Sequence, residues 1–207
     1  MSCALPGAVA YFVRDGELHS PNPLCATGHG TSASGCPVPC GLNTPHRKEA
    51  IPIDFCHIPV SIIKRSEGRS AVAAAAYRSG TKLTNEWDGL THDYTRKGGV
   101  VHAEIMLPAH APPEFSDRST LWNSVEQIEK ARDSQLAREI EAALPRELSR
   151  EQQLALVRAY VKGNFVDKGM CADFAIHDKG TGNPHVHIML TVRPLKENGA
   201  WGAKCRK

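Results

Sequence analysis

No apolar stretch of the 207-residue sequence approaches the roughly 18 residues that a membrane-spanning helix needs, so we expect no membrane insertion. The apolar run at residues 8–13 is too short for a signal peptide and has no positively charged segment before it. Neither charge sign dominates, since 25 Lys and Arg face 22 Asp and Glu. The net charge of +3 permits nucleic acid as a partner without indicating it. With 41% hydrophobic and 23% charged residues, the composition predicts a globular protein with a sizeable core.

The sequence also lacks the features of a disulfide-bonded protein. The seven cysteines are an odd number without a secretory signal, which favours reduced thiols and a cytoplasmic location. Four of them fall in residues 1–50, which also hold six of the 17 glycines and six of the 14 prolines. This stretch has no apolar period, so we expect residues 1–50 to be an irregular, disordered extension and residues 51–207 to be one domain. Cys36 and Cys40, near two histidines, leave a zinc knuckle as a minor alternative.

The periodicity from residue 51 onward predicts strands, helices and then strands again. Strands are predicted at 55–63, 100–107, 171–177 and 185–193, with 93–94 pairing to 100–107 through Gly98 and Gly99. Helices are predicted at 71–79 between Ser70 and Gly80, at 121–143 before Pro145, and from the capping box at 149–152 to Phe165. This order does not alternate as parallel βαβ units do. It favours an α+β domain, a mainly antiparallel sheet with helices packed on one face.

Three histidines share one face of the last two predicted strands. His185 and His187 are two residues apart, and side chains two apart on a strand point the same way. His177 ends the preceding strand, level with His185 across the connecting loop. Three imidazoles with open coordination positions left are typical of a catalytic metal site.

Tyr77 is the one bulky group on the helix predicted at 71–79, which is otherwise rich in alanine. A tyrosine is most often a core residue, but it is also a nucleophile when a neighbouring metal or base favours loss of its proton. Glu139 and Glu141 lie on the predicted helix 121–143, where residues two apart point in different directions, so at most one of them faces such a site. The residues alone do not select Glu139 over its neighbours.

Four motifs together resemble the MobA/MobL family of plasmid mobilisation relaxases, within the HUH endonuclease class. They are SAVAAAAYRSG at 70–80, DYTRKGGVVHAEIMLP at 93–108, LAREIEAALPREL at 136–148, and IH at 176–177 with HVHIML at 185–190. They occur in the family's order and span nearly all of the patterned region. Family members begin close to the first strand and continue beyond the position of Lys207, so an N-terminal extension is expected and a C-terminal truncation stays open.

The resemblance implies a relaxase that nicks one strand of single-stranded DNA at a plasmid origin of transfer. Tyr77 is implied as the nucleophile, leaving a 5′-phosphotyrosine that is resealed after transfer. His177, His185 and His187 are implied as metal ligands, and Glu139 as the acidic residue that assists the tyrosine or the metal. Mg²⁺ or Mn²⁺ is the family's usual metal, although three imidazoles suit Zn²⁺ or Ni²⁺ by ligand type.

Cations near these motifs are candidates for contacts with DNA phosphates. They are Arg78, Lys82, Arg96, Lys97 and Arg193. Accessory mobilisation proteins and a type IV secretion coupling protein are the expected partners besides the DNA. A rolling-circle replication initiator or single-strand transposase is an alternative, less favoured because many of these place the nucleophile after the H-x-H strand. A truncated, non-catalytic DNA-binding remnant also stays open, whereas a cupin-type oxygenase leaves Tyr77 unexplained.

Overall fold

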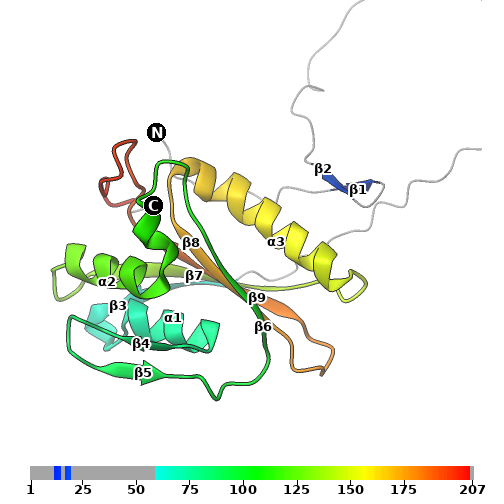
Figure 1. Cartoon of the computed structure of the whole chain (residues 1–207), viewed down its shortest axis with the longest axis horizontal. Helices are drawn as coiled ribbons and strands as arrows, with labels where there is room; N and C mark the ends of the chain where they lie inside the picture. Colours follow the sequence, from blue (N-terminus) through cyan, green and yellow to red (C-terminus); the bar gives the residue numbers. More distant parts are fainter. Residues whose placement is uncertain (1–11, 15–16, 20–58, 206–207) are drawn as a thin grey trace, which may run out of the picture. The chain divides into compact units, whose positions relative to one another are not determined.

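The computed structural model describes residues 12–14, 17–19 and 59–205 (Figure 1). Contacts separate a smaller unit, residues 7–54, from a larger one that contains residues 55–207. In the smaller unit the described residues form one antiparallel pair, β1 (Phe12–Arg14) with β2 (Glu17–His19). The rest of the extension predicted at 1–50, including the zinc-knuckle alternative at Cys36 and Cys40, lies outside the described residues.

A five-stranded sheet is the centre of the larger unit, and every neighbouring pair in it is antiparallel. Its order is β3 (Val60–Lys64), β7 (Gln135–Ala143), β9 (His185–Thr191), β8 (Ala172–His177) and β6 (Val100–Met106). Helices join these strands along the chain, so the predicted α+β class with a mainly antiparallel sheet is confirmed.

One face of this sheet is apolar and is covered by α3 (Arg150–Asn164). Phe174, Ile176 and Ile188 alternate along β8 and β9 and are buried together with Val157 and Val161 of the helix. The helix begins with the predicted capping box, in which the Ser149 and Gln152 side chains each bind the other's backbone N–H. The histidines of β8 and β9 therefore point to the opposite face.

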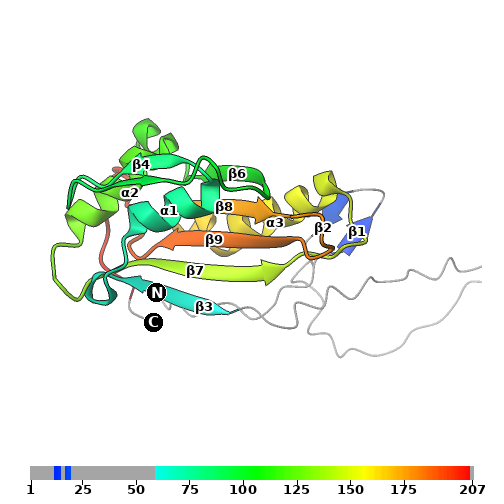
Figure 2. The ribbon, with the colours of Figure 1, turned by 90° about the horizontal axis from the view of Figure 1, so that it is seen from below.

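That opposite face is covered by α1 (Ala71–Ser79) and α2 (Arg118–Ile128) (Figure 2), with the C-terminal end of α1 reaching His177. Ala71, Val72 and Ala75 of α1 are fully buried there with Trp122 of α2 and Met189 of β9. The expectation that all helices pack on one face is therefore wrong. It failed because the histidine face is apolar at one end of the strands and polar at the other.

The long helix predicted at 121–143 is also wrong in its second half. The helix α2 ends at Ile128, and after a turn the chain continues as β7, the strand between β3 and β9. Leu136 and Ile140 are four residues apart, a spacing that both a helix and a strand accommodate; Ala143 continues the helical series and Ala142 continues the alternation of a strand. Pairing with β3 on one side and β9 on the other favours the strand, because the backbone N–H and C=O groups on both of its edges are then hydrogen-bonded. Glu139 and Glu141 consequently lie on a strand.

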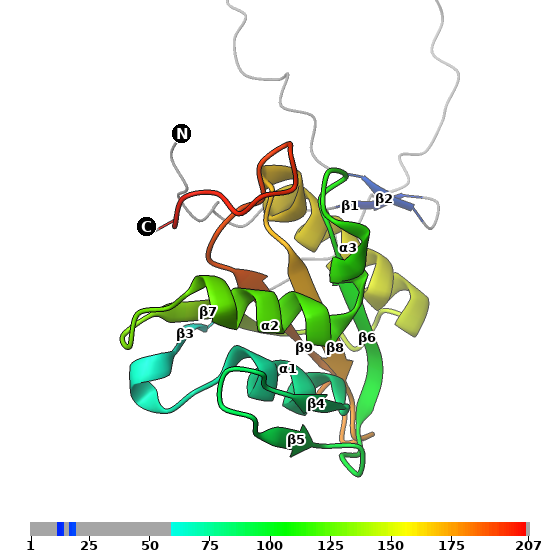
Figure 3. The ribbon, with the colours of Figure 1, turned by 60° about the vertical axis from the view of Figure 1, so that its left-hand side comes forward.

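The segment before β6 forms a separate hairpin, with β4 (Lys82–Thr84) paired to β5 (Thr91–Asp93) beside α1 (Figure 3). The prediction that residues 93–94 pair with the strand at 100–107 is wrong, because Asp93 pairs with Lys82. Three single 3-10 turns complete the described elements: η1 (Arg65–Glu67), η2 (Pro113–Ser116) and η3 (Val166–Lys168). None of the helices in the described part is long and apolar enough to cross a membrane.

Candidate metal and nucleophile site

His177, His185 and His187 converge at one end of β8 and β9. His177 pairs directly with His185 across the two strands, and His187 is one pleat further along the same face. Their ring centroids are 4.7–5.5 Å apart, and one nitrogen from each lies within 4.8 Å of the other two. The predicted juxtaposition of the three imidazoles is therefore present.

The environment of His177 keeps it in the form that binds metals. The residue is 6% exposed, and burial lowers its pKa to about 4, with the charge of Lys97 acting in the same direction. The imidazole is therefore neutral near pH 7. Its Nε2 donates a hydrogen bond of 2.7 Å to the backbone carbonyl of Arg78, which partly opposes the shift in pKa. A backbone carbonyl only accepts, so Nδ1 is the nitrogen left without a proton.

Two carboxylates of β7 lie next to His187. Glu141 pairs with His187 across the strands, and Glu139 is one pleat away on the same face. His187 Nδ1 is 3.5 Å from Glu139 Oε1 and 3.9 Å from Glu141 Oε2. The expectation that the two carboxylates diverge is wrong, because it assumed a helix, and residues two apart on a strand share a face.

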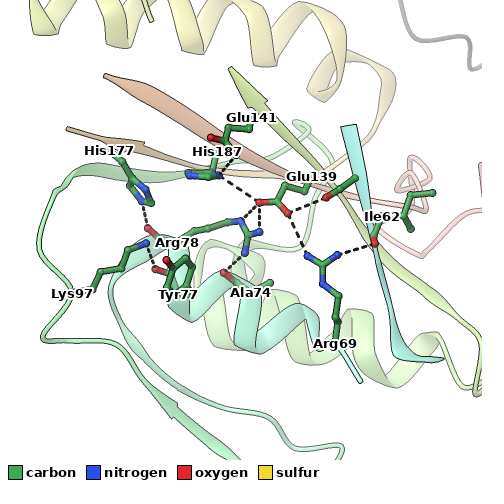
Figure 4. Close-up of polar contacts among 11 residues, drawn as sticks. Ile62, Arg69, Ala74, Tyr77, Arg78, Lys97, Glu139, Glu141, His177 and His187 are labelled. Atoms are coloured by element: carbon green, nitrogen blue, oxygen red, sulfur yellow. Dashed lines mark hydrogen bonds and ion pairs between the residues drawn. The ribbon is translucent and has the colours of Figure 1, made fainter. Parts of the chain in front are cut away.

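Three side chains hold the Glu139 carboxylate (Figure 4). Arg78 of α1 forms an ion pair with its Oε1, and Ser61 of β3 donates to Oε2 at 3.1 Å. Arg69, just before α1, approaches Oε2 at 3.5 Å and donates to the Ile62 carbonyl. Burial alone raises the pKa of Glu139, but His187, Arg78 and Ser61 together lower it to about 2. Glu139 is thus a carboxylate at neutral pH and a weak base.

Tyr77 lies near the C-terminal end of α1, next to Arg78 (Figure 4). Ser70 caps the start of this helix through Ala73 N, and Gly80, at φ 66°, ends it in a left-handed conformation. The Tyr77 side chain is not a core residue, since the residue is 47% exposed. The Lys97 ammonium is 3.6 Å from its ring centroid, and Tyr94 meets the ring edge-on at 5.2 Å.

The five cations predicted to contact DNA do not lie together. Arg78 and Lys97 border the histidines and Tyr77. Arg96 is exposed in the loop before β6, and Lys82 is on β4, 3.9 Å from Asp93. Arg193 follows the far end of β9, where its Nε donates to Glu129 at 2.7 Å.

Sequence reasoning did not single out two residues that bind Glu139, nor a third that lies beside the loop carrying Lys97. Ser61 and Arg69 bind Glu139 from the β3 side, and no sequence pattern marks them. Lys179, in the loop between β8 and β9, lies against the loop that carries Lys97, since a Cβ on Gly99 would be 2.8 Å from Lys179 Cγ. The consecutive glycines at 98–99 were the available signal for this close approach.

The histidine cluster suits a divalent metal ion. The three nitrogens lie within 4.8 Å of one another, so adjustment of the side chains would bring them to an ion shared at about 2.1 Å. The Nδ1 atom of His187 is buried without a hydrogen-bond partner and faces Glu139 across 3.5 Å. A carboxylate behind a ligating imidazole is the usual support of such a ligand. His177, His185 and His187 are thus able to hold the ion from one side and leave coordination positions free.

Comparisons with known proteins show which family the chain belongs to. Residues 69–207 match the model of the MobA/MobL family. The conjugal transfer protein TraA of Agrobacterium fabrum is 48% identical over 160 residues, which cover 72% of this chain and 14% of that protein. The mobilization protein MobL of Acidithiobacillus ferridurans is 39% identical over 173 residues, covering 72% of this chain and 45% of that protein.

A solved structure described as "Molecular Basis of Vancomycin Resistance Transfer in Staphylococcus aureus" superposes with a TM-score of 0.68 at 31% identity. It covers 72% of this chain and 76% of the other. The chain spans about a seventh of the length of the TraA relative. The extent of the family match and the identity to these relatives show that this chain belongs to the MobA/MobL family.

Proposed function

We propose that this chain is a relaxase domain that nicks single-stranded DNA at a plasmid origin of transfer, with Tyr77 as the nucleophile. The observation that carries the proposal is the hydrogen bond between His177 and the carbonyl of Arg78. It ties the helix turn that carries Tyr77 to a cluster of three imidazoles suited to a metal. Relatives named for conjugal transfer and mobilization support the same role.

The reaction is a phosphoryl transfer to tyrosine. The Tyr77 oxygen forms a bond to phosphorus while the bond from phosphorus to the 3′ oxygen breaks. The tyrosine proton passes to solvent and the leaving oxygen takes one up as a free 3′-OH. The 5′ end stays on the enzyme as a phosphotyrosine ester, so a 3′-OH can later attack it and reseal the strand. A divalent ion on the three imidazoles would supply Lewis-acid charge at a phosphate oxygen.

The remaining residues of the site position these groups. Burial keeps His177 a neutral imidazole, and the hydrogen bond to the Arg78 carbonyl sets its tautomer. Glu139 stays ionised and faces His187, which orients that ring for a metal. With a pKa of about 2, Glu139 is a poor acceptor for the tyrosine proton, so its role is to support the metal ligand rather than to activate Tyr77.

The substrate and partners follow from the same proposal. Single-stranded DNA crosses the open end of the histidine face, where Arg78 and Lys97 lie. Lys82, Arg96 and Arg193 are then phosphate contacts more distant from the nick. Arg193 is already bound to Glu129 through its Nε. Mg²⁺ or Mn²⁺ is the metal we propose, with Zn²⁺ or Ni²⁺ as the alternative that the imidazole ligands suit. Accessory mobilisation proteins and a type IV coupling protein are the proposed partners.

The test is covalent capture of a labelled single-stranded oligonucleotide that carries the cognate origin. With Mn²⁺, the wild-type protein should release a 3′-OH fragment and migrate as a protein–DNA adduct on a denaturing gel. Tyr77→Phe should form no adduct and still bind the oligonucleotide. Tyr94→Phe is the matched control, because Tyr94 contacts Tyr77. An adduct that survives Tyr77→Phe and is lost in Tyr94→Phe would assign the nucleophile to Tyr94. If the wild-type protein binds the DNA without nicking it, the proposal is wrong and the chain is a non-catalytic DNA-binding domain.

A further inference from the structure

Lys97 makes two contacts with one residue, Tyr77. Its ammonium donates a hydrogen bond of 2.8 Å to the Tyr77 backbone carbonyl, and it also lies 3.6 Å from the centroid of the Tyr77 ring. Lys97 is in the loop between β5 and β6, so these contacts join two segments that are 20 residues apart in sequence. A lysine that only bound DNA phosphates would need neither of these two contacts with Tyr77.

The Tyr77 side chain has little other support. The residue is 47% exposed, and its described ring contacts are with Lys97 and with the edge of Tyr94. An exposed tyrosine on a helix ordinarily samples several rotamers. Lys97 and Tyr94 both restrict the ring, so loss of Lys97 leaves Tyr94 as its remaining described ring contact.

Lys97 is also surrounded by like charge. Burial lowers the pKa of Lys97 to about 8, and the charges of Arg78 and Lys179 act in the same direction. In the described part of the chain no carboxylate lies within ion-pair distance of Lys97, whereas Arg78 is neutralised by Glu139. At pH 7 the amine is still mostly protonated, so a half-buried cation is kept beside Tyr77 without a partner of opposite sign. An anion that forms at Tyr77 would relieve this repulsion.

We propose that Lys97 is a positioning residue for the nucleophile: it holds the Tyr77 ring for attack and stabilises the negative charge that develops on it. A phenolate shares its charge with the ring, so a cation over the ring face attracts the phenolate more strongly than the phenol. The inference rests on the proposed function, because it assumes that Tyr77 attacks a phosphate.

The test separates the rate of attack from the binding of DNA. Lys97→Met removes the charge and keeps the length of the side chain, Lys97→Arg keeps the charge, and Lys179→Met is the matched control in the neighbouring loop. Each protein is measured for adduct formation in a single turnover at saturating oligonucleotide, for affinity to an uncleavable analogue of that oligonucleotide, and for Mn²⁺ affinity without DNA.

Lys97→Met should slow adduct formation at saturation about tenfold, with at most ~3-fold weaker DNA binding and unchanged Mn²⁺ affinity. Lys97→Arg should recover most of the rate. Lys179→Met should weaken binding in a salt-dependent way and leave the saturated rate unchanged.

Weaker binding in Lys97→Met with a normal saturated rate would overturn the inference and make Lys97 a simple phosphate contact. A slow rate that Lys97→Arg fails to recover would also overturn it, since the charge would not be the cause. If the wild-type protein forms no adduct, the proposed function itself fails and this inference fails with it. An adduct that Tyr77→Phe abolishes and Lys97→Met leaves unslowed would overturn this inference alone.

Discussion

His177 donates a hydrogen bond from Nε2 to the backbone carbonyl of Arg78, over 2.7 Å. This bond fixes the imidazole with Nδ1 unprotonated, and it anchors the residue that follows Tyr77. The Arg78 side chain meanwhile binds Glu139, which faces His187. One arginine therefore links two of the three imidazoles to the helix of the proposed nucleophile. A shift of that helix should therefore displace the histidines, and a shift of the histidines should displace the helix.

The first prediction concerns the metal ligands. His185→Ala removes one of three converging imidazoles, so Mn²⁺ affinity measured by titration calorimetry should fall at least about tenfold. His92→Ala is the control, because His92 lies on β5 in the separate hairpin. Equal Mn²⁺ affinity in His185→Ala and the wild-type protein would contradict the ligand assignment.

The second prediction concerns the pH dependence of stability. The pKa of Glu139 is lowered from 4.5 to about 2 in the folded protein, so its interactions stabilise the fold fully above about pH 4.5 and are lost as the pH falls toward 2. Glu139→Gln cannot ionise. The difference in free energy of unfolding between the wild-type protein and Glu139→Gln should therefore be largest near neutral pH and shrink on acidification.

Urea denaturation at several pH values measures this difference. Glu141→Gln is the control on the same strand face, since its side chain is 51% exposed and its only described ionic contact is 3.9 Å long. A difference between wild type and Glu139→Gln that stays constant down to pH 2 would show that Glu139 keeps its ordinary pKa.

The third prediction concerns the small residues of α1. Ala75 is 1% exposed where the helix lies against the sheet, so Ala75→Leu should destabilise the fold by about 1–3 kcal/mol. The displaced helix also carries Arg78, so Mn²⁺ affinity should fall as well. Ala73→Leu, on a partly exposed side of the same helix, should change stability by less than about 0.5 kcal/mol. Equal effects of the two changes in urea denaturation would refute the close packing of α1.

The fourth prediction concerns a buried charge on the histidine face. Asp173, 6% exposed, accepts hydrogen bonds from the Arg118 guanidinium and from Trp122 Nε1 at 2.8–2.9 Å. Asp173→Ala leaves the arginine charge without a partner and should cost about 3–5 kcal/mol in thermal or urea denaturation.

Asp167→Ala breaks a comparable ion pair, with Lys162, but both of its side chains are more than half exposed. This control should cost about 1 kcal/mol or less. Asp173→Asn, which keeps an acceptor for Trp122, should fall between the two. A small effect of Asp173→Ala would mean that Arg118 reaches solvent.

The features that were predicted correctly depend on local pattern. Alternation on two consecutive strands was enough to bring His177, His185 and His187 to one face, because the direction of a side chain on a strand is set by its position alone. The N-cap at Ser70 and the stop at Gly80 were equally local, and α1 has those bounds. The motif order also carried the family resemblance, which the comparison with residues 69–207 confirmed.

The failures came where a local pattern fits two structures. Residues 135–143 suit a helix as well as a strand, and only pairing with β3 and β9 makes them β7. That one difference decides that Glu139 and Glu141 share the histidine face.

The sequence by itself determined the family, the α+β class and the common face of the three histidines, because each depends on residue order and short-range periodicity. Only the tertiary structure decided that Glu139 is bound by Arg78 and faces His187, that helices cover both faces of the sheet, and that Lys97 lies over Tyr77. These contacts join segments between 20 and about 60 residues apart. Alternative strand pairings and packing surfaces compete to decide which distant segments come into contact. The outcome depends on the whole chain, so it cannot be predicted from any short stretch of the sequence.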